Sequence, residues 1–160
     1  MNRKQKKELA VILPDIRSTH NVGSIFRTAD AAGVSRVYLS GYTPKPIDRF
    51  GRADTAIAKT ALGAERFVPW EYARDTGRLV KRLKAEGWRV VGVEQDARAG
   101  DYRKLNRSGK IAFMFGNEVS GLSPGLRALC DELIEIPMQG QKESLNVSVA
   151  AGIVLFALSR

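Results

Sequence analysis

Cysteine and histidine are nearly absent from the sequence. Its 160 residues include one cysteine, Cys130, and one histidine, His20. A single cysteine excludes an intrachain disulfide, and one cysteine with one histidine cannot supply the ligands of an ordinary zinc site. We therefore expect a protein of the reducing cytoplasm that binds no metal and does not depend on a catalytic histidine.

Long apolar runs and acidic residues are also scarce. No stretch reaches the roughly 18–20 apolar residues that cross a bilayer, so we expect no membrane partner. Lys and Arg number 26 against 17 Asp and Glu, which gives a formal net charge of +9. Such an excess favours an anionic partner, and nucleic acid fits it best. Residues 1–8 are polar and basic, and we interpret them as a partly disordered arm.

The chain length fits one domain of about 100–200 residues, and we assign all of residues 1–160 to it. Near-continuous apolar runs predict strands buried on both faces at Leu9–Leu13, Arg36–Leu39, Arg89–Val93, Lys110–Phe115 and Leu133–Ile136. Helical patterns alternate with these runs at Val22–Ala32, Glu71–Glu86, Pro124–Cys130 and Leu145–Leu158. This order predicts an α/β fold with a mostly parallel sheet flanked by helices.

Two segments depart from the regular pattern. Ser40–Thr55 contains two prolines and two glycines with little periodicity, which indicates a long functional loop. The predicted helix Leu145–Leu158 has almost no polar face. Because such a helix must be covered on all sides, we expect a second subunit to pack against it.

Ligands bind at the carboxyl ends of parallel strands, so the loops after three of the predicted strands are candidate sites. In the first of these loops, Asn21 is predicted to cap a helix from which Arg27 projects two turns later. A capped helix with a solvated arginine explains this stretch equally well when it is considered alone.

The second loop, GNEVSGLS at Gly116–Ser123, resembles a phosphate loop in its two glycines and final serine. Leu122 stands where that motif has lysine, and Glu118 would repel phosphate, which disfavours a nucleoside triphosphate. A tight turn with an exposed glutamate explains the loop equally well.

In the third loop, Ser144 is predicted to cap the last helix and Asn146 to lie in the first turn of that helix. The polar side chain of Asn146 does not stabilise a helix that is otherwise so apolar, so its presence has no structural explanation in the sequence.

Taken together, three patterns resemble the motifs of the SpoU/TrmH family. They are NxGxxxR at Asn21–Arg27, GNExxGLS at Gly116–Ser123 and IPMxGxxESLNVSVA at Ile136–Ala150. Members of this family, within the SPOUT superfamily, are RNA ribose 2′-O-methyltransferases. The resemblance covers nearly the whole chain in order, and three motifs in strand–loop–helix context are far more specific than any one of them.

The resemblance implies an enzyme that uses S-adenosylmethionine (AdoMet), has a C-terminal deep trefoil knot and completes its site across a homodimer. By motif match, the catalytic residues are Asn21, Arg27, Glu118, Ser144 and Asn146. The cofactor-binding residues are Gly116, Asn117, Gly121, Ile136, Met138, Gly140, Ser144, Leu145 and Asn146. Main-chain amides and carbonyls of these turns are expected to give most of the cofactor specificity.

The expected reaction transfers a methyl group from the AdoMet sulfonium to a ribose 2′-hydroxyl of tRNA or rRNA, with tRNA slightly favoured. The family's mechanism makes the Arg27 position a general base, but a guanidinium stays protonated in proteins. We therefore expect Arg27 to bind the adjacent phosphate and polarise the 2′-oxygen, with the final proton acceptor unassigned. We expect the catalytic domain itself to hold the RNA without a separate RNA-binding domain, with phosphate contacts from Arg17, Arg27, Lys45, Arg49 and Arg52.

Two other functions are open at this point. A non-catalytic RNA-binding module that keeps the fold would carry the same basic charge, although the intact residues of the three motifs argue against it. A flavodoxin-like nucleotide binder fits the order of strands and helices, but it leaves the three motifs coincidental.

Overall fold

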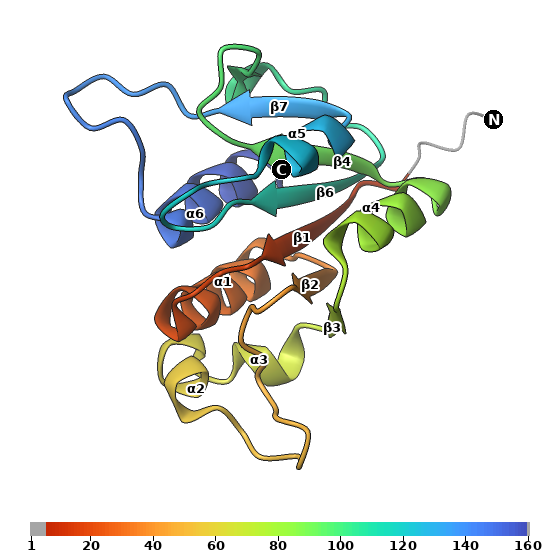
Figure 1. The fold of residues 1–160 in the computed structure, drawn as a ribbon, viewed down its shortest axis with the longest axis vertical. Coiled ribbons are helices and arrows are strands. Elements are labelled where there is room, and N and C mark those ends of the chain that lie inside the picture. Colours follow the sequence, from red (N-terminus) through yellow and green to blue (C-terminus); the bar gives the residue numbers. More distant parts are fainter. Residues whose placement is uncertain (1–5, 160) are drawn as a thin grey trace.

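A seven-stranded parallel sheet runs through the molecule (Figure 1). The computed structural model describes residues 6–159, so residues 1–5 of the predicted basic arm lie outside the described residues. The strand order is β3-β2-β1-β6-β4-β7-β5. These strands are β1 (Glu8–Pro14), β2 (Arg36–Ser40), β3 (Trp70–Ala73), β4 (Arg89–Val93), β5 (Gly100–Asp101), β6 (Lys110–Phe115) and β7 (Glu132–Glu135).

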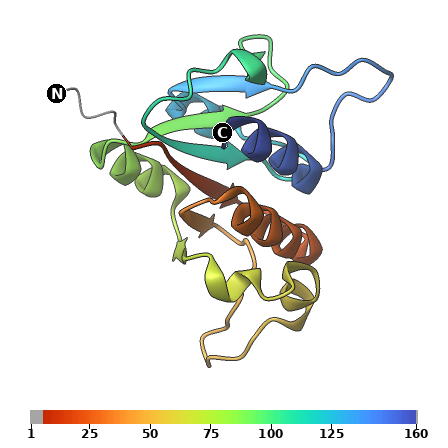
Figure 2. The same cartoon turned by 180° about the vertical axis from the view of Figure 1, so that it is seen from behind.

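Helices cover both faces of the sheet (Figure 2). One face packs against α1 (Thr19–Ala32), α2 (Thr55–Ala61), α3 (Ala64–Phe67) and α6 (Val147–Leu158). The other packs against α4 (Thr76–Ala85) and α5 (Pro124–Leu129). A short 3-10 helix, Tyr102–Lys104, follows β5. The predicted α/β class with a parallel sheet flanked by helices is therefore confirmed.

Each face of the sheet has its own apolar core, because successive side chains of a strand point to opposite faces. In β1, Leu9 and Val11 lie in the core under α1 and α6, whereas Ala10 and Ile12 lie in the core under α4. Every residue of β1 after the first is buried, as is every residue of β6 after Lys110. The near-continuous apolar runs in the sequence are thus explained by burial on both sides.

The five predicted strands are all present, but the helix predicted at Glu71–Glu86 is wrong at its start. Residues 70–73 form β3 on the edge of the sheet, and α4 begins only at Thr76, after Asp75 has capped it. Trp70 and Tyr72 have the aromatic side chains that favour strands. The helical spacing comes from Leu79, Val80 and Leu83 alone, which are the buried residues of α4.

The short helices α2 and α3 and the two-residue strand β5 are absent from the sequence prediction. A signal for α2 exists, because Asp54 accepts hydrogen bonds from the backbone N–H groups of Ala56 and Ile57. The predicted loop Ser40–Thr55 therefore ends in a helix cap. Gly23 lets α2 pack closely on α1, since a Cβ at that position would lie 2.5 Å from the carbonyl oxygen of Ile57.

The C-terminal part of the chain crosses the connection between β4 and β5. Strand β7 pairs with both of these strands, so residues 94–99 must pass over the end of β7. Two hydrogen bonds tie this connection to β7 and the residue after it: Glu94 N–H to the carbonyl of Ile134, and Gln95 Nε2 to the carbonyl of Ile136. This crossing is consistent with the expected knot, which stays a prediction.

Helix α6 packs its apolar side chains against α1 but leaves part of its surface uncovered. Val147, Ala151, Val154, Leu155 and Leu158 are buried in the chain's own core. Val149 and Phe156 are 49% and 45% exposed. Among residues 6–159, no helix has the length and apolar composition needed to cross a bilayer. The uncovered side of α6 is thus an apolar surface on one chain.

Candidate active site

Three neighbouring strands, β6, β4 and β7, end at one edge of the sheet, and the segments that follow them enclose a cavity of about 430 Å³. The first turn of α6 completes the cavity. Loops at the carboxyl ends of parallel strands are where such sites are expected. Of the residues predicted from sequence, the lining includes Gly116, Asn117, Glu118, Gly121, Ile136, Ser144, Leu145 and Asn146.

The carboxylate of Glu118 connects the loop after β6 to the start of α1. Its Oε2 accepts a hydrogen bond from the backbone N–H of Arg17 at 3.1 Å. Its Oε1 accepts from the backbone N–H of Ser18 at 3.1 Å and from Nδ2 of Asn21 at 3.2 Å. One side chain therefore holds in place the loop between β1 and α1, as well as the first turn of that helix.

The ionised form of Glu118 is favoured in the folded protein. Partial burial raises the pKa of Glu118, but the hydrogen bonds from the backbone of Arg17 and Ser18 and from Asn21 outweigh burial and hold it below its usual value. The carboxylate is therefore ionised at neutral pH and accepts hydrogen bonds at both of its oxygens.

Asn21 joins the first loop to the last helix, and it is not the helix cap that the sequence predicts. Ser18 is the N-cap of α1, and its side chain accepts a hydrogen bond from the backbone N–H of Asn21 at 3.1 Å. Asn21 is buried, with its Oδ1 3.3 Å from Nδ2 of Asn146. Asn21 is the third residue of α1, so it lies inside the helix and is not its N-cap.

Asn146, in turn, caps α6, where the sequence predicts Ser144 as the cap. Its Oδ1 accepts hydrogen bonds from the backbone N–H of Ser148 at 2.9 Å and from the hydroxyl of Ser148 at 2.6 Å. Helix α6 consequently begins at Val147 instead of Leu145. The Asn146 side chain thus fixes the helix start with its oxygen and contacts Asn21 with its nitrogen.

The glycines of the loop after β6 allow that loop to fold back on itself. Asn117 and Gly121 exchange two backbone hydrogen bonds, at 3.2 and 2.9 Å. A Cβ at Gly116 would lie 2.5 Å from the carbonyl carbon of Gly121, and Gly121 has a positive φ of 65°. Gly116 therefore provides space for the loop itself, and its expected contact with the cofactor stays a prediction.

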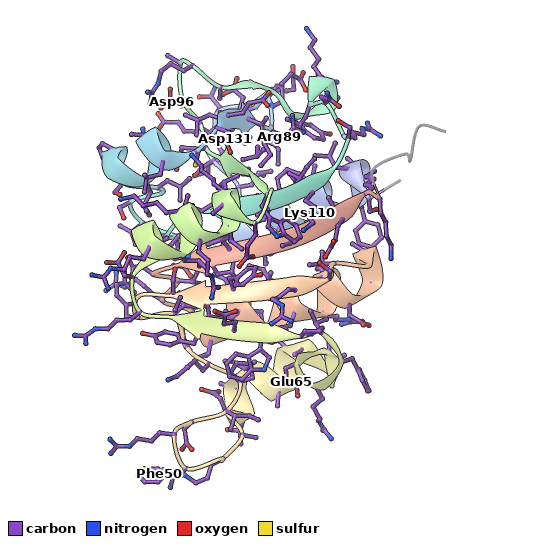
Figure 3. The ribbon with its side chains drawn as sticks, turned by 90° about the vertical axis from the view of Figure 1, so that its right-hand side faces the viewer. Phe50, Glu65, Arg89, Asp96, Lys110 and Asp131 are labelled. Carbon is purple, nitrogen blue, oxygen red and sulfur yellow. The ribbon has the colours of Figure 1, made fainter. Side chains whose placement is uncertain are left out.

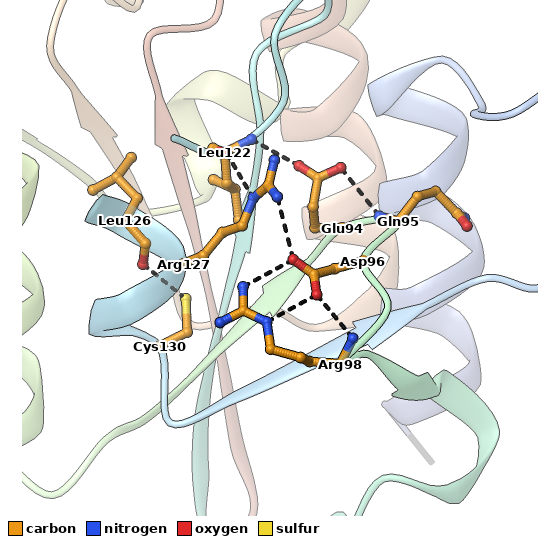
Figure 4. A network of polar contacts seen from close by, with 8 residues as sticks. All are labelled: Glu94, Gln95, Asp96, Arg98, Leu122, Leu126, Arg127 and Cys130. Atoms are coloured by element: carbon orange, nitrogen blue, oxygen red, sulfur yellow. Dashed lines mark hydrogen bonds and ion pairs between the residues drawn. The ribbon is translucent and has the colours of Figure 1, made fainter. Parts of the chain in front are cut away.

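Glu94 lines the cavity but is missing from the sequence prediction. Figure 4 shows its polar contacts. Its Oε2 accepts a hydrogen bond from the backbone N–H of Leu122 at 2.7 Å. Arg127 Nε donates to the carbonyl of the same Leu122 at 2.8 Å, and Arg127 also pairs with Asp96 at 3.2 Å. The position of Glu94, directly after the predicted strand Arg89–Val93, is the sequence signal that could have found it.

Cys130 and Asp96, which lie near Glu94, have no reactive character. Burial raises the pKa of the Cys130 thiol to about 11, so it is protonated and packs as a partly buried apolar group beside α5. Hydrogen bonds from Arg98, with a further one from Arg127, hold the pKa of Asp96 well below its usual range. Both groups therefore support the loops structurally.

Several predicted site residues lie outside the cavity of their own chain. Arg27 is exposed on α1, and neither Met138 nor Gly140 lines the cavity. Of the predicted RNA contacts, Arg17 lies beside Glu118 through its backbone, while Lys45, Arg49 and Arg52 lie on the loop between β2 and α2. The roles assigned to these residues stay predictions.

The cavity is acidic although the protein is basic. Glu94, Glu118 and Glu135 line it, and none of the described residues in the lining is Lys or Arg. Side chains of Phe115, Ile136 and Leu145 give it apolar walls. Within residues 6–159 there is no group of three His, Cys, Asp or Glu side chains that could hold a metal ion. The arrangement suits a small organic ligand with positive charge and disfavours a polyphosphate.

Residues 8–156, which include this cavity, match the SpoU rRNA Methylase family. The chain belongs to that family. A relative from Ralstonia nicotianae, named 23S rRNA (guanosine-2′-O-)-methyltransferase RlmB, is 38% identical over 152 residues, which make up 95% of this chain and 58% of the relative. The chain thus spans about three fifths of the length of the curated relatives it matches.

Solved structures of SpoU methyltransferases have the same fold. An AdoMet-bound rRNA methyltransferase from Sinorhizobium meliloti aligns with a TM-score of 0.87 at 33% identity, over 97% of this chain and 57% of that one. The TrmH/SpoU tRNA modifying enzyme of A. aeolicus aligns with a TM-score of 0.82 at 28% identity, over 98% of this chain and 76% of that one.

Replacement of Glu118 by Gln is expected to lower the free energy of unfolding at neutral pH by about 1 kcal/mol, because the amide cannot accept from all three donors. The folded pKa of Glu118 lies below its usual 4.5, so its contribution to stability is complete above that pH and disappears as the pH falls through the folded value. Urea unfolding between about pH 7 and pH 3 measures the difference.

The matched control is Glu143→Gln, which changes an exposed glutamate in the segment before α6. The stability gap between wild type and the Glu118→Gln variant should narrow toward acid, while the control should follow wild type throughout. If the difference in free energy of unfolding between wild type and Glu118→Gln stays constant with pH, the ionised carboxylate is not the source of the added stability.

Proposed function

We propose that this chain transfers a methyl group from AdoMet to a ribose 2′-hydroxyl of RNA, with ribosomal RNA as the substrate class. The observation that carries the proposal is the contact between Asn21, Glu118 and Asn146, which brings the three family motifs together beside an acidic cavity. The named relative from Ralstonia nicotianae supports ribosomal RNA over the tRNA that the sequence slightly favours.

The cavity residues fit AdoMet. A volume of about 430 Å³ lies in the range of roughly 300–1,000 Å³ typical of small-molecule pockets. AdoMet carries a positive sulfonium, and the carboxylates of Glu94, Glu118 and Glu135 are the charges that favour such a cation. The backbone of the loop after β6 and the apolar side chains of Ile136 and Leu145 would hold the adenosine.

When bound, AdoMet supplies a methyl group that is already activated by its attachment to positive sulfur. The protein's task is then to align the acceptor oxygen and to favour loss of its proton. Glu118 fixes the loop before α1, and Asn21 with Asn146 fixes the two helix starts relative to each other. In this proposal, Arg27 binds the phosphate next to the target ribose and stabilises negative charge on the 2′-oxygen.

A second copy of the chain is part of the proposal, because Arg27 lies outside the cavity of its own chain. The uncovered side of α6, with Val149 and Phe156, is an apolar surface on which a second copy can pack. Since α6 packs against α1, a dimer through this surface would bring the arginine of one copy near the cavity of the other.

The direct test of the function has a binding arm and a transfer arm. Calorimetric titration with AdoMet in EDTA should give heat, and methyl-labelled AdoMet should label 23S rRNA at a ribose 2′-oxygen in preference to total tRNA. Ribose-methylation mapping of RNA from a deletion strain identifies the site. An absence of heat and of thermal stabilisation at millimolar AdoMet would favour the non-catalytic RNA-binding module instead.

Arg27→Ala separates catalysis from cofactor binding. Because Arg27 is assigned to the RNA side of the site, AdoMet affinity should change by no more than a few-fold. Methyl transfer should fall by about 10²–10³-fold, the effect of deleting one preorganised donor to a developing oxyanion. Asn146→Ala should instead weaken AdoMet binding as well as turnover, since Asn146 caps α6 at the cavity. Single-turnover rates and calorimetry measure the two effects.

Arg27→Lys distinguishes phosphate binding from general-base catalysis. Lysine keeps the positive charge and releases a proton more easily, but it lacks the planar fork of the guanidinium. If Arg27 binds phosphate and the 2′-oxygen, the lysine variant should be nearly as impaired as the alanine variant at every pH. Recovery of near-normal single-turnover rates at alkaline pH would support the general-base role.

Phe156→Glu tests the dimer, because it places a charge on the uncovered side of α6. An unpaired charge in an apolar interface costs several kcal/mol, so light scattering should show monomers, and methyl transfer should be lost with the dimer. Phe67→Glu is the control, since Phe67 is a 74% exposed phenylalanine on α3, away from α6. A wild-type protein that is already monomeric would contradict the proposed dimer.

Mixed dimers test whether the copies share their sites. Arg27→Ala and Asn146→Ala chains are each expected to be inactive, but their coexpression should restore about a quarter of wild-type activity if each site takes the two residues from different copies. No restoration would place both residues of a site on one chain.

A further inference from the structure

An exposed aromatic ring projects from the loop between β2 and α2. Phe50 is 66% exposed, and it lies at the end of the loop that extends furthest from the sheet in the view of Figure 3. A bridge between Ile47 and Ala53 closes the turn. The carboxylate of Asp48 accepts hydrogen bonds from the backbone N–H groups of Phe50 and Arg52 at 2.8 and 2.9 Å. The turn therefore holds an apolar ring exposed to water, and its burial by a partner would be favourable.

Two guanidinium groups lie against the Phe50 ring. The Cζ atom of Arg49 is 4.8 Å from the ring centroid, and that of Arg52 is 4.9 Å from it. Both distances are within the roughly 6 Å of a cation–π contact. Arg52 is also held by Asp48 at 2.8 Å, whereas Arg49 has no ion-pair partner among residues 6–159. One cation thus belongs to the framework of the turn, and the other can leave the ring.

The loop that carries Phe50 starts at the cavity. The hydroxyl of Tyr42 accepts a hydrogen bond of 2.9 Å from Nδ2 of Asn117, which lines the cavity. Further along, Nζ of Lys45 lies 4.5 Å from the centroid of Tyr72. Between the cavity and the tip, the loop therefore carries the aromatic residues Tyr42 and Phe50, and its Lys45 lies over Tyr72 of the neighbouring strand β3.

We propose that Phe50 is a stacking site for an unpaired base of the RNA substrate. The base covers the exposed ring, Arg52 stays on the turn, and Arg49 turns to a neighbouring phosphate. Proteins bind single-stranded RNA through this combination of an aromatic platform and nearby cations, whereas duplex RNA keeps its bases stacked on one another. The proposal rests on the proposed function, because that function makes RNA the substrate.

The charges around Phe50 favour RNA over a second copy of this chain. The turn presents Lys45, Arg49 and Arg52, of which Arg52 pairs with Asp48, while Asp54 at its end caps α2. A symmetric contact between copies would bring two such cationic turns together, which is unfavourable. A polyanion removes the same repulsion and covers the ring, so an unpaired nucleotide fits both the charge and the apolar surface.

Fluorescence anisotropy with labelled oligoadenylate of about 12 nucleotides, a length within the site sizes of single-strand binding domains, tests the proposal. Phe50→Ala should raise the Kd for the single strand by about 5- to 100-fold, the effect of one lost base–aromatic stack. The Kd for a duplex of the same length should change little. Phe50→Trp should retain affinity, and its added tryptophan emission should be quenched by the single strand. Phe67→Ala, which removes a 74% exposed ring that contacts no guanidinium group within residues 6–159, should behave as wild type.

The outcomes separate this proposal from the proposed function. If Phe50→Ala binds the single strand as wild type does while AdoMet binding and methyl transfer persist, the stacking site is wrong and the methyltransferase function stands. A lower molar mass of Phe50→Ala in light scattering would assign the ring to a contact between copies and overturn the stacking site. A wild-type protein that neither binds RNA nor transfers methyl would overturn both proposals.

Discussion

The carboxylate of Glu118 is the interaction on which the geometry of the site depends. It receives the backbone of Arg17 and Ser18 and the amide of Asn21, so it holds the start of α1 against a loop about a hundred residues further along the chain. Asn21 then contacts Asn146 at the start of α6. Because the two helices also pack along their lengths, these polar contacts and the apolar core fix the same relative position.

The strands and the region of the site could be predicted from the sequence for one physical reason. A parallel sheet buries both faces of its strands, so the strands appear as apolar runs, and the polar residues that follow them must gather at one edge. Gly116–Ser123 follows β6, and the lining it contributes was predictable from that placement alone. The resemblance to a known family then supplied the chemistry, which spacing alone could not provide.

The contacts inside the site could not be predicted, because a local pattern does not reveal a distant partner. Asn21 and Ser144 both have the residue types and positions of helix caps, yet Ser18 and Asn146 cap the helices. Asn21 lies inside α1, where its side chain contacts Glu118 and Asn146, and neither of these distant partners is visible in the local sequence pattern. Segment 70–73 is similar: it forms a strand because the edge of β2 is available to pair with it.

The distribution of charge divides the surface between two kinds of ligand. The chain has a formal charge of +9, yet three glutamates and no Lys or Arg line the described part of the cavity. A basic surface attracts a polyanion along its length, while an acidic cavity rejects phosphate and accepts a compact cation. The two sets of charges therefore need not compete for one ligand. Glu118 lies between the two ligand sites. Its carboxylate lines the cavity, and it also binds the backbone that leads to α1, the helix that carries the arginine proposed to contact RNA.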